Sequence, residues 1–379
     1  MSVWVILFSS TQINKFENWG VSYKLTVILN YILLFSLVFV FTLKRTLGFY
    51  LIFELRFLPI FFIIIRWGRA RDRIVSGFYL IYYTIVGSLP FFFSLIYIIE
   101  LKLSINFFIL KYLSSINLII IIWFLIVFLI KFPIYGLHLW LLKAHVEAPV
   151  WGSIILSGVI LKLGGYGIIR TSAVWENMEI MKELILFFCV LGGAKARYYC
   201  LARNDIKLRI ALSSVVHMRF CIISLLYLVN WRIKGSVILI LGHGLCSSGL
   251  FFLCNRFYQI YGRRRLVVRK GILNIFPIFG IVWFLICRCN ISCPPSINLL
   301  REMIIIRSLA IFGGLFFSLV FILILFFRAC YSLYLYYVYN HRSRRKNVIV
   351  IDYNIITIFS GLFHWAPLNL LILSVYIFF

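Results

Sequence analysis

The chain has 379 residues, of which 63% are hydrophobic, 18% aromatic and only 13% charged. A soluble domain has roughly 45–50% apolar and about 25% charged residues, so the composition excludes a soluble globular fold and predicts an all-α, polytopic membrane protein. The formal net charge of +27 would suggest a nucleic-acid partner in a soluble protein, but no soluble domain could present a basic face here, so we expect membrane lipids and no nucleic acid around the chain.

The apolar residues fall into about twelve stretches. Each has about 20 residues, which is enough to cross a hydrocarbon core of roughly 30 Å as a helix. The stretches lie near residues 24–43, 46–66, 75–98, 116–137, 149–170, 184–202, 208–230, 235–258, 272–290, 297–314, 315–339 and 355–378. Residues 2–9 are a candidate for a further short segment, and the N-terminus predicts neither a secretory signal nor a mitochondrial presequence. We therefore expect one membrane-embedded domain over residues 1–379.

Ionisable side chains lie inside four of these stretches: Glu54, Lys131, Lys162 and Glu302. A charge at the bilayer centre costs about 2.5–3.5 kcal/mol on insertion scales, so such groups usually face a polar interior and have a function. Burial favours the neutral forms of glutamate and lysine, whereas an opposite charge nearby favours the ionised forms. A series of such groups can therefore exchange protons when a neighbouring charge changes. The alternative for each of them is a static ion pair that holds two helices together.

Prolines interrupt the apolar pattern at two places. Pro133 follows Lys131 inside an apolar stretch and removes a backbone hydrogen bond there. Pro294 and Pro295 precede the stretch that carries Glu302. Paired, proline-interrupted segments in two halves of a chain indicate an inverted-repeat transporter whose site lies near the middle of the membrane.

Histidines and cysteines differ in what they predict. His138 follows Lys131 by seven residues, which would place it on the same helical face two turns further on, and His217 and His243 lie in other stretches. Because imidazole titrates near neutral pH, we predict that these histidines relay protons. The closest cysteines, at positions 287, 289 and 293, lack the fourth ligand or neighbouring histidine of a zinc or iron–sulfur site, so we expect no metal.

Residues 131–170, KFPIYGLHLWLLKAHVEAPVWGSIILSGVILKLGGYGIIR, carry several His, Lys, Pro and Gly landmarks in a specific order. This stretch resembles the signature of mitochondrial subunit 4 in the family of antiporter-like membrane subunits of NADH:ubiquinone oxidoreductase (complex I). Three further blocks fit the same family in the same order: NDIKLRIALSSVVHM (204–218), ILGHGLCSSGLFFLCN (240–255) and CPPSINLLREM (293–303). With FELRFLPI upstream, the resemblance covers roughly residues 24–340.

The resemblance implies two inverted repeats, each with a discontinuous helix, and a proton path along the membrane midplane. Glu54 would be the charge-coupling glutamate and Lys162 the central relay lysine. Lys131 and Glu302 would belong to the first and second broken helices. The chain would be a subunit of a proton-translocating enzyme in the mitochondrial inner membrane, next to other membrane-arm subunits. It would bind no cofactor itself, because NADH, flavin, iron–sulfur clusters and ubiquinone would belong to those partners.

Two features depart from the family pattern. The chain begins about two helices later than members of the family usually do, so we expect an N-terminus shortened relative to the family. Arginine is also unexpectedly frequent. Basic clusters at 69–73, 263–265 and 342–346 fit loops, but six arginines lie at positions where the family has a small residue or inside apolar runs: Arg56, Arg209, Arg219, Arg301, Arg307 and Arg328.

Many animal mitochondria read the codons AGA and AGG as serine, and a serine would fit an apolar helix. We therefore hypothesise that several of these positions are serine in the protein. If they are arginine, the side chains must form ion pairs or reach the membrane surface.

A second function remains open at the level of the sequence. The related Mrp-type cation/proton antiporters share the helices and buried charges, but they have no redox partner. The block HLWLLKAHVEAP, at residues 138–149, favours the oxidoreductase subunit over the antiporter.

Overall fold

The computed structural model describes residues 5, 21–68, 72–100, 118–175, 178–226, 230–261, 271, 273, 276–312, 314–340 and 355–373. The chain divides into two compact units, Met1–Leu184 and Ile185–Phe379. Single-domain organisation over the whole chain stays a prediction. The candidate segment 2–9 and the basic clusters at 69–73, 263–265 and 342–346 lie wholly or largely outside the described residues.

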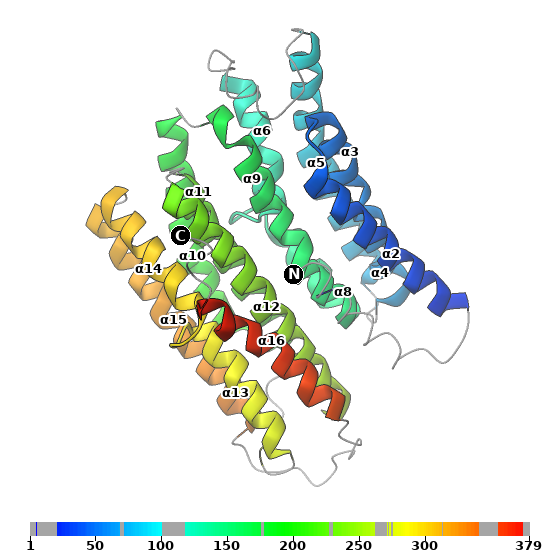
Figure 1. Ribbon diagram of the computed structural model, residues 1–379, viewed down its shortest axis with the longest axis vertical. Helices are drawn as coiled ribbons and strands as arrows, with labels where there is room; N and C mark the ends of the chain where they lie inside the picture. Colours follow the sequence, from blue (N-terminus) through cyan, green and yellow to red (C-terminus); the bar gives the residue numbers. More distant parts are fainter. Residues whose placement is uncertain are drawn as a thin grey trace. The chain divides into compact units, whose positions relative to one another are not determined.

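In its described residues, the first unit consists of helices (Figure 1). They are α2 (Val21–Thr42), α3 (Thr46–Leu55), α4 (Phe57–Trp67), α5 (Arg73–Glu100), α6 (Leu118–Lys131), α7 (Leu139–Glu147), α8 (Val150–Ile155), the π-helix η2 (Leu156–Ile160) and α9 (Leu161–Trp175). Helix α5 packs on α4, α6 and α7, and α6 also packs on α9. The predicted stretch 46–66 is two helices, because the backbone turns at Arg56.

Helix α10 (Glu179–Ala202) begins at the end of the first unit and continues into the second. The other helices of the second unit are α11 (Ile206–Leu226), α12 (Asn230–Tyr261), α13 (Pro277–Ile291), α14 (Ile297–Phe312), α15 (Gly314–Asn340) and α16 (Ile355–Leu373). Helix α12 is central in this unit, since it packs on α11, α13, α14 and α16, while α15 packs on α13 and α14.

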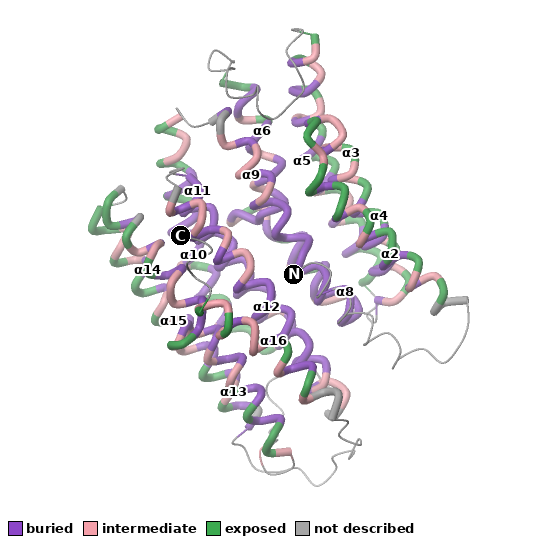
Figure 2. The backbone as a smooth tube through the Cα atoms, viewed as in Figure 1, coloured by how far each residue is buried: buried purple, intermediate pink, exposed green. Residues whose placement is uncertain are grey.

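Burial separates inner from outer helices (Figure 2). In the second unit 94% of the apolar span of α11 is buried, whereas only 22% of the span of α15 is. Buried α11 carries Ser213, Ser214 and His217, and both serine hydroxyls donate to carbonyls three residues earlier. Exposed positions of α15 are instead apolar, as at Phe316 and Phe326. Polar groups thus lie inside and apolar groups outside, which is the arrangement that lipid requires.

Within the described residues, eight helices are long and apolar enough to cross a membrane. Three shorter apolar helices accompany them: Leu118–Lys131, Pro277–Ile291 and Ile358–Leu373. The prediction of an all-helical, polytopic membrane fold is therefore confirmed, whereas the number of twelve spans stays a prediction. The first two of these short helices each end where a helix is interrupted, after Lys131 and after Ile291.

Candidate functional site

The first helix break lies between α6 and α7, where residues 132–138 form turns. Pro133 has no backbone N–H, so a regular helix is interrupted at this point. Gly136 has a φ of 102°, a conformation that glycine adopts without the strain of a Cβ atom. The indole Nε1 of Trp140 donates to the carbonyl of Ile130 at 3.0 Å, and this bond satisfies one of the carbonyls left open at the end of α6.

Glu54 and Lys131 form an ion pair in the first unit. The Nζ atom of Lys131, the last residue of α6, lies 3.2 Å from both carboxylate oxygens of Glu54 and donates a hydrogen bond to Oε2. The side chain of Lys131 is 1% exposed and that of Glu54 is 20% exposed. The ring of Phe57, the first residue of α4, covers the ammonium group, with Nζ 3.4 Å from the ring centroid. Two residues 77 positions apart are thus brought together at a helix break.

Lys162 lies at the start of α9, directly after the π-helix η2. Its Nζ atom donates to the carbonyl of Ser157 at 2.5 Å. A π-helical turn changes the regular backbone pairing and is frequent at functional sites, so the lysine uses a carbonyl that the turn presents. Gly164, two residues after Lys162, lies directly against Phe132 of the first break.

The predicted placement of His138 on the helical face of Lys131 is wrong. Helix α6 ends before the break, so no continuous helix connects the two residues. His138 lies at the N-cap of α7, its Nδ1 accepts a hydrogen bond from the backbone N–H of Gly136 at 3.2 Å, and its ring stacks on Tyr135 with centroids 5.0 Å apart. These contacts stabilise the turn, and a role of His138 in proton transfer stays a prediction.

The second helix break lies between α13 and α14, in the second unit. Ser292 follows the end of α13 in the left-handed conformation, with a φ of 72°. Pro294 and Pro295 come two residues later. Asn298, in the first turn of α14, donates through Nδ2 to the carbonyl of Cys289 at 2.7 Å. A discontinuous helix in each half was predicted and is confirmed, whereas the inverted relation between the halves stays a prediction.

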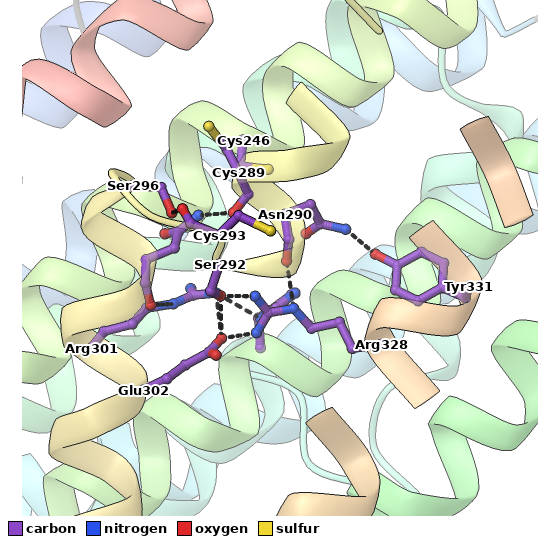
Figure 3. A network of polar contacts seen from close by, with 12 residues as sticks. Cys246, Cys289, Asn290, Ser292, Cys293, Ser296, Arg301, Glu302, Arg328 and Tyr331 are labelled. Atoms are coloured by element: carbon purple, nitrogen blue, oxygen red, sulfur yellow. Dashed lines mark hydrogen bonds and ion pairs between the residues drawn. The ribbon is translucent and has the colours of Figure 1, made fainter. Parts of the chain in front are cut away.

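Glu302 belongs to a buried cluster beside the second break (Figure 3). Its Oε1 accepts a hydrogen bond from the Ser292 hydroxyl at 2.5 Å, and Nη2 of Arg301 lies 3.6 Å from the same oxygen. Arg328 of α15 contacts both Glu302 and Ser292, and its Nε donates to the carbonyl of Asn290. The predicted acid of the second broken helix therefore lies at the break itself, held by residues of α13, α14 and α15.

His217 of α11 and His243 of α12 lie next to each other, with ring centroids 5.0 Å apart. Both are buried. Nη2 of Arg301 lies 3.3 Å from Nδ1 of His217, so the histidine pair adjoins the Glu302 cluster. The second unit thus gathers three of the predicted site residues, and the first unit joins Glu54 to Lys131.

The arginines of the serine hypothesis differ in their surroundings. Arg307 is exposed and lies beside the ring of Trp231, 5.3 Å from its centroid. Arg209 is buried and donates to the carbonyls of Leu201 and Arg203 at 3.0 and 2.6 Å. For Arg56, none of the three side-chain nitrogens has a hydrogen-bond partner in the described part of the chain. Some of these positions therefore suit an arginine, and others do not.

Three residues of the site were not found from the sequence: Phe57, Trp140 and Asn298. Trp140 and Asn298 satisfy backbone carbonyls at the two breaks, and a side-chain donor one turn after a proline break is a usable signal for such a role. Phe57 follows Glu54 by three residues, which is the spacing of one helical face. Its contact with Lys131 nevertheless depends on where α6 ends, and the sequence near Phe57 does not carry that information.

Among the residues with described positions, no group of three or more His, Cys, Asp or Glu side chains could hold a metal ion. Within the described residues none of the nine cysteines forms a disulfide, and seven of them are buried.

The chain is similar to proteins of a known family. Residues 43–327 match the family described as NADH:quinone oxidoreductase/Mrp antiporter, TM. The chain is 38% identical over 381 residues to NADH-ubiquinone oxidoreductase chain 4 of Ceratitis capitata, covering 99% of this chain and 84% of that one. It is 40% identical over 329 residues to the same chain of Aedes aegypti, covering 86% and 73%.

Solved structures share the fold. Respiratory complex I from Thermus thermophilus with bound NADH contains a chain that superposes with a TM-score of 0.86 at 19% identity, over 97% of this chain and 78% of that one. The Mrp complex from Dietzia sp. contains another, with a TM-score of 0.80 at 15% identity, over 90% of this chain and 38% of that one. The family match and the extended identity to its insect members agree with the two broken helices and their buried charges, and the chain belongs to the NADH-ubiquinone oxidoreductase chain 4 family.

Proposed function

We propose that this chain is a membrane-arm subunit of mitochondrial NADH:ubiquinone oxidoreductase that moves protons across the inner membrane. Electron transfer from NADH to ubiquinone would take place in partner subunits, which would hold the flavin and the iron–sulfur clusters. This chain would carry out no redox chemistry, and neighbouring antiporter-like subunits would be its closest partners. The proposal is supported by the family, by the identity to insect chain 4 proteins and by the buried charges at the two helix breaks.

The Glu54–Lys131 pair is the observation that carries the proposal. At 3.2 Å two unit charges interact with about 5 kcal/mol at an effective dielectric of about 20. Protonation of Glu54 removes that attraction. The equilibrium between the ammonium and the amine of Lys131 then shifts strongly toward the amine. Because the pair joins the end of α6 to the end of α3, a change of charge at one residue acts directly on the other. A static structural pair would not need to lie at a helix break.

Further proton-carrying groups would follow along the chain. Lys162 in the first unit, and Glu302 with the histidines at 217 and 243 in the second, are the candidates. All four are buried. Lys162 lies beside the π-helix and Glu302 at the second break, and such turns present open backbone groups and admit water inside a membrane protein, while the two histidines lie inside α11 and α12 next to the Glu302 cluster.

Substitution of the pair tests the proposal. In the assembled enzyme, Lys131→Met and Glu54→Gln should each reduce NADH-driven proton pumping to roughly a tenth or less, as expected for loss of a group that transfers a proton. NADH oxidation should fall together with pumping, because a blocked proton step holds back electron transfer. Proton uptake by vesicles and NADH oxidation should be measured on the same preparation.

Lys143→Met is the matched control. Lys143 lies on α7 just after the same break, is exposed, and contacts the ring of Tyr79 at 3.3 Å. Its loss removes one positive charge but should leave pumping near the parent value. Normal pumping in an assembled Lys131→Met variant would exclude the pair from the mechanism.

The fold match to an Mrp complex supports a second candidate, a cation/proton antiporter without a redox partner. It is the weaker candidate, because the relatives with 38–40% identity are oxidoreductase chains. In that case pumping would follow a sodium or potassium gradient and would not need NADH.

A further inference from the structure

The ammonium group of Lys131 lies between two partners of different kinds. On one side the Glu54 carboxylate is 3.2 Å away, and on the other the centroid of the Phe57 ring is 3.4 Å from Nζ. Lys131 is 1% and Phe57 4% exposed, so water does not screen the contact. The face of an aromatic ring carries the negative part of its quadrupole and attracts a cation, more strongly when both are desolvated.

Other groups around Lys131 oppose its charge or make a weaker contact of this kind. In the described residues, the charged groups that act on Lys131 are Glu54 and Arg56. Arg56 opposes the ammonium charge, and its own guanidinium lies 4.0 Å from the centroid of the Phe53 ring and 5.1 Å from that of Phe57. The Phe53 ring is 5.4 Å from Nζ, which makes it a weaker cation–π partner than Phe57. Helices α5 and α9 also pack on α6, with Gly87 against Ile130 and Gly167 against Phe128.

An isolated carboxylate–ammonium pair has an unproductive alternative in a dry site. The proton can move from Nζ of Lys131 to the Glu54 carboxylate, so that an N–H bond breaks, an O–H bond forms and both groups become neutral. In a neutral pair an arriving proton would be accepted by the amine of Lys131 and not by Glu54, so the carboxylate would no longer be the group that takes up the proton. Coupling therefore requires a group that favours the ammonium form of Lys131 independently of Glu54.

We propose that Phe57 is this positioning residue: its ring holds the ammonium of Lys131 in place and keeps it charged while Glu54 takes up a proton from a water-borne donor. The inference rests on the proposed function of the Glu54–Lys131 pair. Phe57 does not transfer a proton and acts only through Lys131. The ring is well placed for this task, because Phe57 follows Glu54 by three residues and Arg56 between them keeps right-handed helical backbone angles, so both side chains reach Lys131.

The test compares aromatic and aliphatic residues at position 57 in the assembled enzyme. Phe57→Leu keeps an apolar side chain but removes the ring, and Phe57→Tyr keeps the ring. We expect Phe57→Leu to lower the protons pumped per NADH oxidised and to move the alkaline side of the pumping profile by about one pH unit to lower pH, a roughly tenfold effect. Phe57→Tyr should restore the parent profile.

Phe53→Leu is the graded comparison, because Phe53 has the same side chain, is equally buried and lies further from Nζ, at 5.4 Å, which is still within the range of a cation–π contact. Its pH profile should shift less than that of Phe57→Leu. A role of Phe57 in packing alone would lower the amount of assembled enzyme and leave the profile of the remainder unchanged. Phe57→Met, which has a flexible side chain of similar volume, gives the same comparison if the leucine variant does not assemble.

Each outcome is decisive for one of the two proposals. A parent-like profile for Phe57→Leu, or an equal shift in Phe57→Leu and Phe57→Tyr, would overturn the role of the ring. An equal shift in Phe53→Leu would do the same. If Lys131→Met pumps normally, the proposed function itself fails, and this result is independent of the Phe57 variants.

Discussion

Buried arginines differ in how well their surroundings fit a guanidinium. In the described part of the chain seven are buried: Arg56, Arg197, Arg209, Arg219, Arg232, Arg301 and Arg328. A guanidinium presents five N–H donors and costs about 3 kcal/mol at the bilayer centre. For Arg56 and Arg197 no side-chain nitrogen has a hydrogen-bond partner in this part of the chain, and aromatic rings are the groups beside them. A serine hydroxyl would instead donate to a backbone carbonyl, as Ser213 and Ser214 do.

We predict that residues 56, 219 and 301 are serine in the protein made by the organelle. Peptide mass spectrometry of the purified chain should give serine masses at these positions, and trypsin should not cleave after residue 219 or 301. Arg170 is the control, because its Nε and Nη2 atoms donate to the Tyr166 hydroxyl and the Leu43 carbonyl, both at 2.8 Å. Cleavage after residues 170, 219 and 301 alike would establish all three as arginine and refute the hypothesis.

At the scale of elements, the positions of the helices were largely predictable and their irregularities only partly so. The stretch 75–98 is helix α5 (Arg73–Glu100), because a long apolar run in lipid has no other way to satisfy its backbone. Both proline breaks were also predictable, since proline has no N–H to donate. The interruption at Arg56 and the π-helix Leu156–Ile160 were not, because hydropathy does not record local backbone geometry.

The site was predictable in its residues but not in its contacts. Glu54 and Lys131 were identified because a charge inside an apolar run is costly, and that cost is visible in the sequence. Their pairing, and the position of the Phe57 ring, depend on which helix ends face each other. His138 was misplaced for the same reason, since a seven-residue spacing defines a common face only within an unbroken helix.

Helix α12 supports the second break through the absence of a side chain at Gly242. A Cβ atom there would clash with Oδ1 of Asn298, whose Nδ2 holds the Cys289 carbonyl at the end of α13. Gly242→Ala should therefore displace the Asn298 amide and leave that carbonyl open, at a cost of about 1–3 kcal/mol. We expect faster thermal inactivation of the assembled enzyme, measured as loss of NADH-driven proton pumping on heating.

Gly193→Ala is the matched control on α10. A Cβ atom at Gly193 would lie 3.4 Å from the Ile324 side chain, an ordinary contact, so the helix propensity of alanine should keep stability unchanged or raise it slightly. Asn298→Asp removes the donor without changing the shape of the side chain and should reproduce the effect of Gly242→Ala. Equal stability of all three variants would show that the Asn298 bond does not hold the break together.

At the scale of the whole molecule, each unit has a break in a helix and places a carboxylate beside it. Glu54 lies near the first break through Lys131, and Glu302 lies at the second. Outer helices such as α15 present apolar side chains, so the charged groups are kept inside each unit. This division explains how a strongly apolar chain can keep ionisable groups inside a membrane. A chain of this kind handles protons and needs an energy source from elsewhere.

That dependence on partners predicts how the chain migrates after mild solubilisation. As a subunit of NADH:ubiquinone oxidoreductase, it should run on a native gel in a large band that stains for NADH dehydrogenase activity and reacts with an antibody to this chain. The same band should contain the other membrane-arm subunits, because a proton path without an electron-transfer partner has no driving force. Migration only in a smaller assembly without NADH oxidation would favour the antiporter, and proton movement driven by a sodium or potassium gradient in vesicles would then establish it.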